Sequence, residues 1–462
     1  MKKSLFNYLT LIAILLAVLL VTASLALVFV GNVGDSSLPV DADADAAITA
    51  ATSFSRFSNG IQYYYTNPTA NSTTTITVVH TDTWGSQKNP FVINTKEQWV
   101  YFVNVITAKN STYHGTGKYF VLGNDLNFGN ETINPVGVTT DGFKGILYGN
   151  KHTLSNVKLA AVTDPIATSQ RAGGFFYYIN GGSVYDLTIA SNCTFNYATN
   201  YATLAGTLTA RSANATYCNV ISNANITVNN SGNTTNASLG LWVGGLVGYN
   251  YGASLAFYKC SYVGTITVTP FGSAITASGN DCHKVGGLLG GGISGITAFT
   301  VDACYVKANL TYHGGGINVG GLFGNLGGPA ENTCLIKLTN NVVRIVYTED
   351  GVIQSHDIAG LGNMGANVSF KTGSTVSGIY LHWTGALTAR FVGSWNGAES
   401  TGTTLSNNVA NVTIGTATVN ATPESAAASN SGVTNYWTIS GTTVTTKLNS
   451  SFNIQYDLAG GS

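Results

Sequence analysis

Charged residues are scarce in this chain of 462 residues, where Asp, Glu, Lys and Arg together make up only 9%. A typical soluble domain carries about 25%. The 20 basic residues balance the 20 acidic ones, so the formal net charge is zero. The chain therefore lacks the basic surface that nucleic-acid binding requires. Its polar surface must come from Asn, Thr and Ser, which can stack in uncharged ladders.

Cysteine is also sparse, with six residues, and no pair has the C-x-x-C spacing. Without that spacing, a structural zinc site is not expected. The histidines are scattered as well, with no metal-ligand spacing. We expect neither a metal nor a cofactor in this protein.

What the sequence does contain is a repeated six-residue phrase. It reads Val-Gly-Gly-Leu-Val-Gly at 243–248 and returns with small changes at 285–290 and 319–324. Weaker copies begin at Ala172, Leu204 and Ile358. A phrase that returns every few tens of residues indicates stacked structural units. We assign a structural role to these repeat residues: Gly173, Gly174, Gly244, Gly245, Leu246, Gly286, Gly287, Leu288, Gly320, Gly321 and Leu322.

Each unit also carries a short alternating segment, such as Ile226-Thr-Val228 or Ile266-Thr-Val268. Period two is typical of a β-strand with one apolar face. Helical spacing of apolar residues is missing from the units. About three short strands per unit, stacked on those of the next, predict an all-β chain folded as a parallel β-helix. Paired glycines then mark a tight corner or a close neighbour.

Four cysteines follow their phrases at similar distances, which predicts one inward-facing ladder of Cys218, Cys260, Cys304 and Cys334. A free thiol behaves in a core as a small apolar side chain. A disulfide between neighbouring units stays open, because adjacent strands bring Cα atoms within bridging distance.

The repeats resemble the GLUG repeat of bacterial and archaeal surface proteins, on Val243-Gly-Gly-Leu-Val-Gly-Tyr-Asn-Tyr-Gly252 and Tyr258-Lys-Cys-Ser-Tyr-Val-Gly-Thr-Ile-Thr-Val268. The lead-in at 89–99, 119–128 and 143–157 is similar to that of the same proteins, so the resemblance covers about residues 89–370. It implies a right-handed β-helix on an extracellular protein, often an adhesin, without a catalytic motif.

The N-terminal part divides into three segments. Residues 1–30 hold two lysines and a long apolar run, which predicts either a cleaved signal peptide or a signal anchor. Residues 31–88 read as a linker followed by N-terminal strands. Residues 89–110 form a capping segment, because Thr95-Lys-Glu-Gln98 has the form of a helix capping box. The short helix, expected to run to about Asn104, would cover the open first unit.

The β-helix is expected over 111–445, and residues 446–462 resemble the opening strand of a Listeria–Bacteroides repeat, as in an incomplete further β module. A chance match stays open for that last segment. We expect export to the cell surface or medium, with membrane contact only through the N-terminal segment or an unseen C-terminal anchor.

We expect an adhesin or surface stalk without catalysis, which binds glycans or host and neighbour cell-surface proteins. Tyr249 and Tyr251 are the candidate binding residues, because tyrosines stack on sugar rings, although packing within the repeat would also explain them. A polysaccharide-active enzyme is the alternative, since β-helices host lyases and glycosidases that need paired carboxylates. Its candidate residues are Glu349, Asp350, His356 and Asp357. A structural spacer or envelope-layer component is the third reading.

Overall fold

The computed structural model describes residues 48–393, apart from short segments at 69–71, 169, 199–200, 231–239, 270–282, 293–294, 314–315, 328–331, 351–354, 365–367 and 386–389, together with five short strands between 404 and 457. The predicted signal segment, the first part of the linker and most of 446–462 lie outside the described residues. Within them the chain is nearly all strand, with a single helix, as the sequence predicts.

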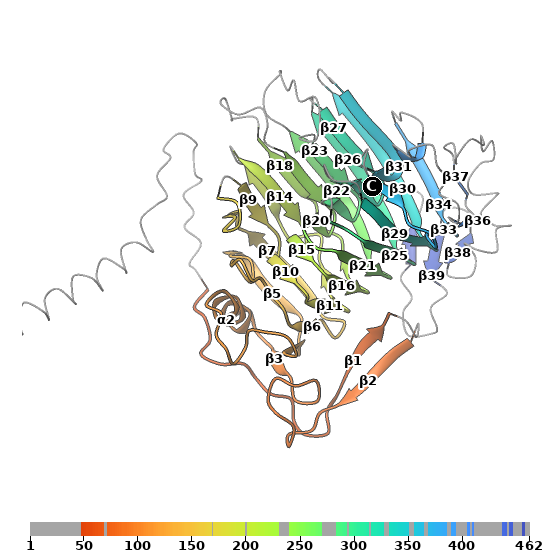
Figure 1. Cartoon of the computed structure of the whole chain (residues 1–462). Helices are drawn as coiled ribbons and strands as arrows, with labels where there is room; N and C mark the ends of the chain where they lie inside the picture. The colour runs from red at the N-terminus through yellow and green to blue at the C-terminus, as the bar shows by residue number, and fades with distance from the viewer. Residues whose placement is uncertain are drawn as a thin grey trace, which may run out of the picture. The chain divides into compact units, whose positions relative to one another are not determined.

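Three large sheets contain most of the strands, and successive repeat units contribute neighbouring parallel strands to each (Figure 1). Sheet 1 consists of β3 (Phe91–Ile93), β4 (Tyr119–Leu122), β6 (Ile146–Tyr148), β11 (Ser183–Tyr185), β16 (Ala215–Cys218), β21 (Ser254–Tyr258), β25 (Ala298–Asp302), β29 (Asn332–Thr339), β33 (Thr375–Ser377) and β36 (Thr404–Ser406), with β32 (Val368–Phe370) beside β29.

Sheet 2 continues from sheet 1 in every unit. It consists of β5 (Leu126–Ile133), β7 (Thr153–Leu159), β12 (Thr188–Ile189), β17 (Ile221–Ser222), β22 (Ser261–Thr269), β26 (Tyr305–His313), β30 (Val342–Asp350), β34 (Tyr380–Thr384) and β37 (Val409–Ala410), with β13 (Phe195–Ala198) and β18 (Ile226–Asn229) paired beside them.

Sheet 3 holds the repeated phrase, which supplies two strands per unit on either side of a bend. The first series is β9 (Gln170–Gly173), β14 (Ala202–Gly206), β19 (Leu241–Gly244), β23 (His283–Gly286) and β27 (Gly316–Gly320), with β8 (Val162–Thr163) antiparallel at its edge. The second is β10 (Phe176–Asn180), β15 (Thr209–Ala213), β20 (Val247–Asn250), β24 (Leu289–Gly292) and β28 (Phe323–Leu326). Both series end on β31 (Ser355–Met364), which pairs with β35 (Arg390–Gly393).

Two antiparallel elements complete the strands. The hairpin β1 (Gln62–Asn67) and β2 (Ser72–Thr77) packs Tyr63 and Ile76 against Tyr148 of sheet 1. A small sheet is formed by β38 (Trp437–Ser440), β39 (Thr443–Thr446) and β40 (Gln455–Asp457).

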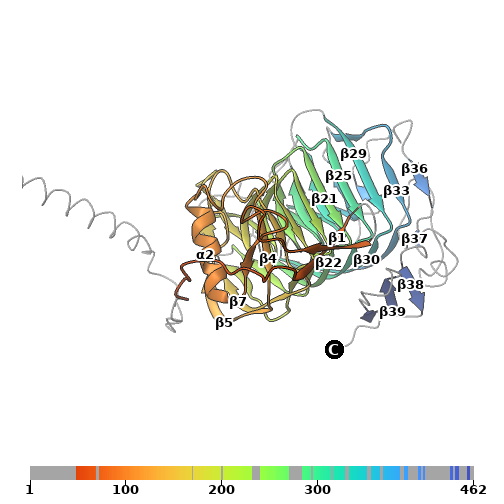
Figure 2. The ribbon, with the colours of Figure 1, turned by 90° about the horizontal axis from the view of Figure 1, so that it is seen from below.

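The helix α2 (Lys96–Thr107) has the capping geometry that its sequence predicts. The Thr95 hydroxyl accepts a hydrogen bond from the Gln98 amide, and the Gln98 side chain accepts one from the Asn94 amide at 2.8 Å. The helix ends at Thr107 rather than near Asn104. Its buried Trp99 and Phe102 pack on phenylalanines of the first units, so α2 lies across the N-terminal end of the stacked strands (Figure 2).

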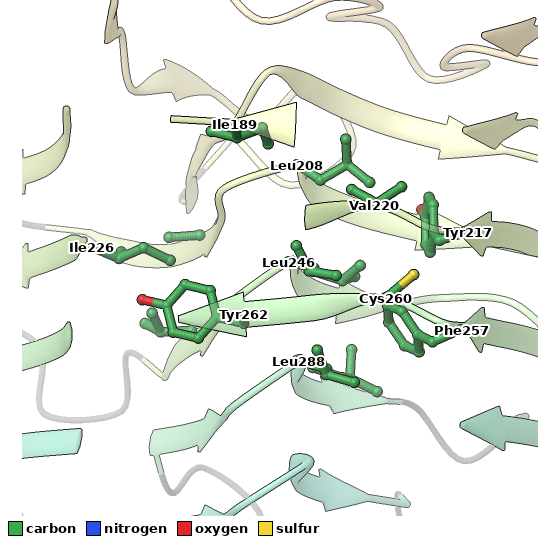
Figure 3. Packing of buried hydrophobic residues seen from close by; sticks show 14 of the residues in the cluster. Ile189, Leu208, Tyr217, Val220, Ile226, Leu246, Phe257, Cys260, Tyr262 and Leu288 are labelled. Carbon is green, nitrogen blue, oxygen red and sulfur yellow. The ribbon is translucent and has the colours of Figure 1, made fainter. Parts of the chain in front are cut away.

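Side chains of equivalent positions stack in the core. Leu208, Leu246 and Leu288, which follow the phrase glycines in successive units, lie one above the next (Figure 3). Their backbones are joined directly, because the Leu208 amide donates to the Leu246 carbonyl and the Leu246 amide to that of Leu288. The leucine of the phrase is therefore a core residue.

Five of the phrase glycines are explained by close neighbours rather than by unusual backbone angles. A Cβ on Gly244, Gly286 or Gly320 would lie 2.1 Å from the carbonyl oxygen three residues later. A Cβ on Gly245 or Gly287 would lie 2.1 Å from a carbonyl oxygen of the next unit. These five described glycines do not adopt a left-handed φ. Both reasons that the sequence suggested hold for these glycines, because they lie at the bend of the phrase and their close neighbours leave no room for a side chain.

The strand register corrects one weak copy of the phrase. Thr209 pairs with Val247, and Gly206 pairs with Gly244. The second copy therefore starts at Ala205, and the alignment from Leu204 was wrong by one residue.

The cysteine ladder is also corrected. All five described cysteines are free and buried. Ser261 pairs with Tyr305, so the preceding Cys260 and Cys304 occupy equivalent positions. Cys218 instead pairs with Tyr258, and Cys334 lies near the start of β29, paired with Phe370. Only two of the four predicted members share a column, because the corner between sheets 1 and 2 follows the phrase after a variable number of residues. Cys282 lies outside the described residues.

Candidate ligand-binding face

An aromatic group lies on the outer side of sheet 3, around the first close copy of the phrase. Trp242 precedes the inward-facing Val243, so period two directs its side chain outward. Its ring centroid is 5.4 Å from that of Tyr249 on β20, which is 6.5 Å from that of Tyr251. Tyr251 is 49% exposed, whereas the other two rings are half-buried. We call these three residues the aromatic face.

The candidate tyrosines thus lie side by side, and Trp242 joins them. The sequence analysis missed Trp242, although alternation with Val243 would have placed it on this side. Tyr249 contributes part of its ring to packing, and Tyr251 is the more accessible of the two.

A buried arginine stands beside the aromatic face. Arg211 on β15 pairs with Tyr249 of the next unit and with Tyr178 of the preceding one. Its Cζ atom is 5.8 Å from the ring centroid of Tyr249 and 5.4 Å from that of Tyr251. Both distances are within the range of cation–π attraction. No sequence signal pointed to Arg211, which directly follows a weak copy of the phrase.

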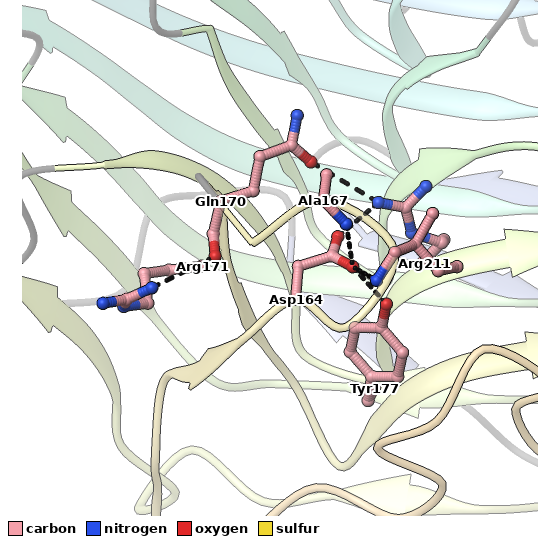
Figure 4. Close-up of polar contacts among 7 residues, drawn as sticks. Asp164, Ala167, Gln170, Arg171, Tyr177 and Arg211 are labelled. Carbon is pink, nitrogen blue, oxygen red and sulfur yellow. Dashed lines mark hydrogen bonds and ion pairs between the residues drawn. The ribbon is translucent and has the colours of Figure 1, made fainter. Parts of the chain in front are cut away.

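Asp164 holds this arginine in place (Figure 4). Its carboxylate forms an ion pair with Arg211 Nη2, and both side chains are almost fully buried. It also accepts hydrogen bonds from the Ile166 amide at 2.7 Å, the Ala167 amide at 3.1 Å and the Tyr177 hydroxyl. These hydrogen bonds offset part of the desolvation cost of the charge pair. Arg211 is therefore fixed before any ligand arrives.

The phenols near Arg211 stay protonated. Burial raises the pKa of Tyr249 to about 12, and the positive charge of Arg211 only partly opposes this. Burial and the bond to Asp164 raise the pKa of Tyr177 further. At neutral pH these groups are neutral hydroxyls that donate and accept hydrogen bonds.

Two more cations pack on rings of the same sheet. Lys284 Nζ lies 5.8 Å from the Trp242 ring centroid. The guanidinium of Arg171 lies 3.9 Å from the centroid of Tyr201, which is 41% exposed. Sheet 3 therefore presents most of its few charges next to aromatic rings.

The residues considered for catalysis fall on two different strands. Glu349 and Asp350 end β30 of sheet 2, and His356 and Asp357 begin β31 of sheet 3. Glu349 accepts a hydrogen bond from Tyr347, and Asp350 is exposed and contacts His313. Across the described parts of the chain, no group of three potential metal ligands comes together.

The chain matches no protein-family model, no curated protein and no solved structure. In the part of the chain that the structure covers, no helix is both long and apolar enough to cross a membrane.

Proposed function

We propose that this protein is a right-handed parallel β-helix that is exported and acts at the cell surface as a glycan-binding adhesin or stalk. Three observations support the β-helix. Each unit contributes strands to sheets 3, 1 and 2 in that order, the pairing between units is parallel, and the core is filled by stacked equivalent residues. We propose the right hand because connections between parallel strands of the same sheet are almost always right-handed.

Export and surface location rest on the N-terminal sequence. Lysines precede the apolar run of residues 9–30, which is the arrangement of signal segments. The low charge and the resemblance to GLUG-repeat proteins point the same way.

Glycan binding rests on one observation, the aromatic face with its fixed guanidinium. The apolar side of a sugar ring packs on an aromatic ring, and an exposed Tyr251 offers such a surface next to Tyr249 and Trp242. The phenol hydroxyls would form hydrogen bonds with sugar hydroxyls. The polar side chains of the Asn- and Thr-rich strands would do the same. Since the core is packed with side chains, binding would use this lateral face and neighbouring loops rather than an interior pocket.

We propose binding without catalysis. A glycosidase needs two carboxyl groups facing one bond, about 5–10 Å apart. Glu349 and Asp350 already have partners in Tyr347 and His313, and the other two candidates start a strand in another sheet. A structural spacer remains the second candidate, favoured by the stack of similar units.

Screening the purified protein on a glycan array tests the proposal. Any polysaccharide that binds is then incubated with the protein, and the products are analysed for shorter chains. We expect retention of a subset of glycans and no release of shorter products. A protein that binds no glycan and no cell surface would support the spacer, and release of shorter chains would support the enzyme.

A further inference from the structure

A buried polar column marks the corner between sheets 1 and 2. Asp186, Asn219 and Lys259 occupy this corner in three successive units. Each donates its backbone N–H to the carbonyl just before the equivalent residue of the next unit: Asp186 to Cys218, Asn219 to Tyr258 and Lys259 to Asp302. Their φ angles are 52°, 54° and 54°. Because the backbones match, the three side chains leave the corner in the same direction, about 4.8 Å apart.

All three side chains are withdrawn from water. Asp186 is 3% exposed, Asn219 is 6% exposed and Lys259 is 7% exposed. The Lys259 Nζ atom is buried and makes no hydrogen bond within the described structure. A chain with so few charges thus buries an amine without a direct partner, which is costly for an ammonium ion.

The neighbours of Lys259 in the column differ in chemistry. On one side lies Ala303, which has no functional group. On the other lies Asn219, whose carboxamide is already engaged, since Nδ2 donates to Asp186 Oδ1 at 2.7 Å. Asp186 is in turn fixed by the Thr66 amide of the β1–β2 hairpin at 2.6 Å. An amine, a carboxamide and a carboxyl group are therefore stacked in order inside an enclosed corner.

We propose that Lys259 and Asn219 become joined by an intramolecular amide bond in the folded protein. The neutral Nζ attacks Cγ of Asn219, a bond forms between them, and the bond from Cγ to Nδ2 breaks. The Asp186 carboxyl group, which contacts Nδ2, gives it a proton, and Nδ2 leaves as ammonia. The proton that Nζ loses then restores the Asp186 carboxyl group. One amine and one carboxamide give one secondary amide and one ammonia, so the step needs no oxidant or cofactor.

The protonation states suit this step. Burial lowers the pKa of Lys259, although the nearby acidic groups of Cys218, Asp302 and Asp186 partly oppose that. The neutral amine is the nucleophile. Burial raises the pKa of Asp186, against the hydrogen bonds from Asn219 and Thr66, which brings its carboxyl group closer to proton exchange at neutral pH. The product would tie two units together outside the apolar core, independently of whether the aromatic face binds a glycan.

Peptide mapping of the reduced, denatured full-length protein by mass spectrometry decides the question. We expect a branched species that contains the peptides of Asn219 and Lys259, with the mass of their sum less one ammonia, and no cleavage by trypsin after Lys259. Separate, unmodified Asn219 and Lys259 peptides from the folded protein would overturn the proposal.

Two variants test the roles. Lys259→Arg keeps a long side chain but cannot form the bond, so the reduced protein should migrate more slowly in a denaturing gel than the linked wild type. Asp186→Asn keeps the shape and should leave most of the two residues unlinked while circular dichroism still shows strand. Full linkage in Asp186→Asn would overturn the proton relay, and equal migration of wild type and Lys259→Arg would contradict the link itself. The wild-type peptide map decides the outcome even if a variant does not fold.

Discussion

Gly286 lies against Gly324 of the next unit so closely that a Cβ on Gly286 would stand 2.6 Å from the Gly324 amide nitrogen. The same Cβ would stand 2.1 Å from the Leu289 carbonyl oxygen. Both obstacles are backbone, which cannot swing aside as a long side chain can. At Gly286 the bend of the phrase therefore leaves no room for a side chain.

Replacing Gly286 with valine should destabilise the protein by at least about 1–3 kcal/mol, the usual range for overpacking. Ala256→Val is the matched control, because Ala256 points outward on β21 between Thr216 and Thr300. It should change stability by less than about 0.5 kcal/mol. Chemical denaturation followed by circular dichroism compares the midpoints, and equal midpoints would refute the close approach.

The described cysteines should resist labelling in the folded protein. Burial raises the pKa of Cys193 to about 11 and that of Cys334 to about 12, so little reactive thiolate forms. In a Cys282→Ser background, iodoacetamide should modify the protein slowly in buffer and at all five sites in denaturant. Fast modification without denaturant would show that these thiols are not in the core.

The buried ion pair at Arg211 should contribute far more to stability than an exposed one. Asp164→Ala leaves the guanidinium buried without its partner and should cost about 3–5 kcal/mol. Asp141 forms a salt bridge of 2.9 Å with Lys109, and the side chains of Lys109 and Asp141 are 42% and 43% exposed. Asp141→Ala removes this pair and should cost about 0–1 kcal/mol. Thermal melting of both variants measures the contrast, and similar losses would contradict the assigned burial.

Stability should fall in mild acid because of His283. Its ring is buried, its Nδ1 accepts the Leu241 amide, and burial lowers its pKa to about 4. An unfolded histidine has a pKa of about 6.5. Between these two pKa values the histidine is protonated in the unfolded chain but not in the folded chain. The free energy of unfolding therefore declines from about pH 6.5 down to about pH 4, by on the order of 3 kcal/mol.

His283→Gln keeps a side chain that can accept the Leu241 amide and does not titrate. Its denaturation midpoint should depend less on pH across that window than the midpoint of the wild type. Parallel pH profiles of the two proteins would mean that another group causes the acid sensitivity.

The sequence predicted the parts of this fold that depend on local periodicity. Ile226 and Val228 lie inward as their alternation indicates, and the Thr95 cap starts α2. The prediction of equivalent positions from the sequence failed where units differ in length. Counting residues from the phrase grouped Cys218 with Cys260, whereas the corner column places Cys218 one residue ahead of Asn219, opposite Tyr258.

The candidate site was only partly predictable for a related reason. Tyr249 and Tyr251 stand out in sequence because they follow a close copy of the phrase. Asp164 and Arg211 are 47 residues apart and meet only because β8, which ends just before Asp164, and β15 belong to one sheet. Such a contact depends on strand register between units, which a single sequence does not specify.

The last prediction concerns binding. If the aromatic face holds a glycan, Tyr251→Ala and Trp242→Ala should each weaken retention at least about tenfold, or ~1.4 kcal/mol, because each removes a stacking surface. Tyr64→Ala is the matched control. Tyr64 is also an exposed tyrosine, 38% accessible, and Lys151 Nζ lies 5.2 Å from its ring centroid. It belongs to the β1–β2 hairpin and not to sheet 3.

Binding should also change little between low and moderate salt. Arg211 is already paired with Asp164, so the face gains little from long-range attraction to a charged polymer. Isothermal titration or array signals for the three variants at two salt concentrations provide the measurement. Equal loss in Tyr64→Ala, or unchanged affinity in both face variants with the strand spectrum intact, would move the binding site away from sheet 3.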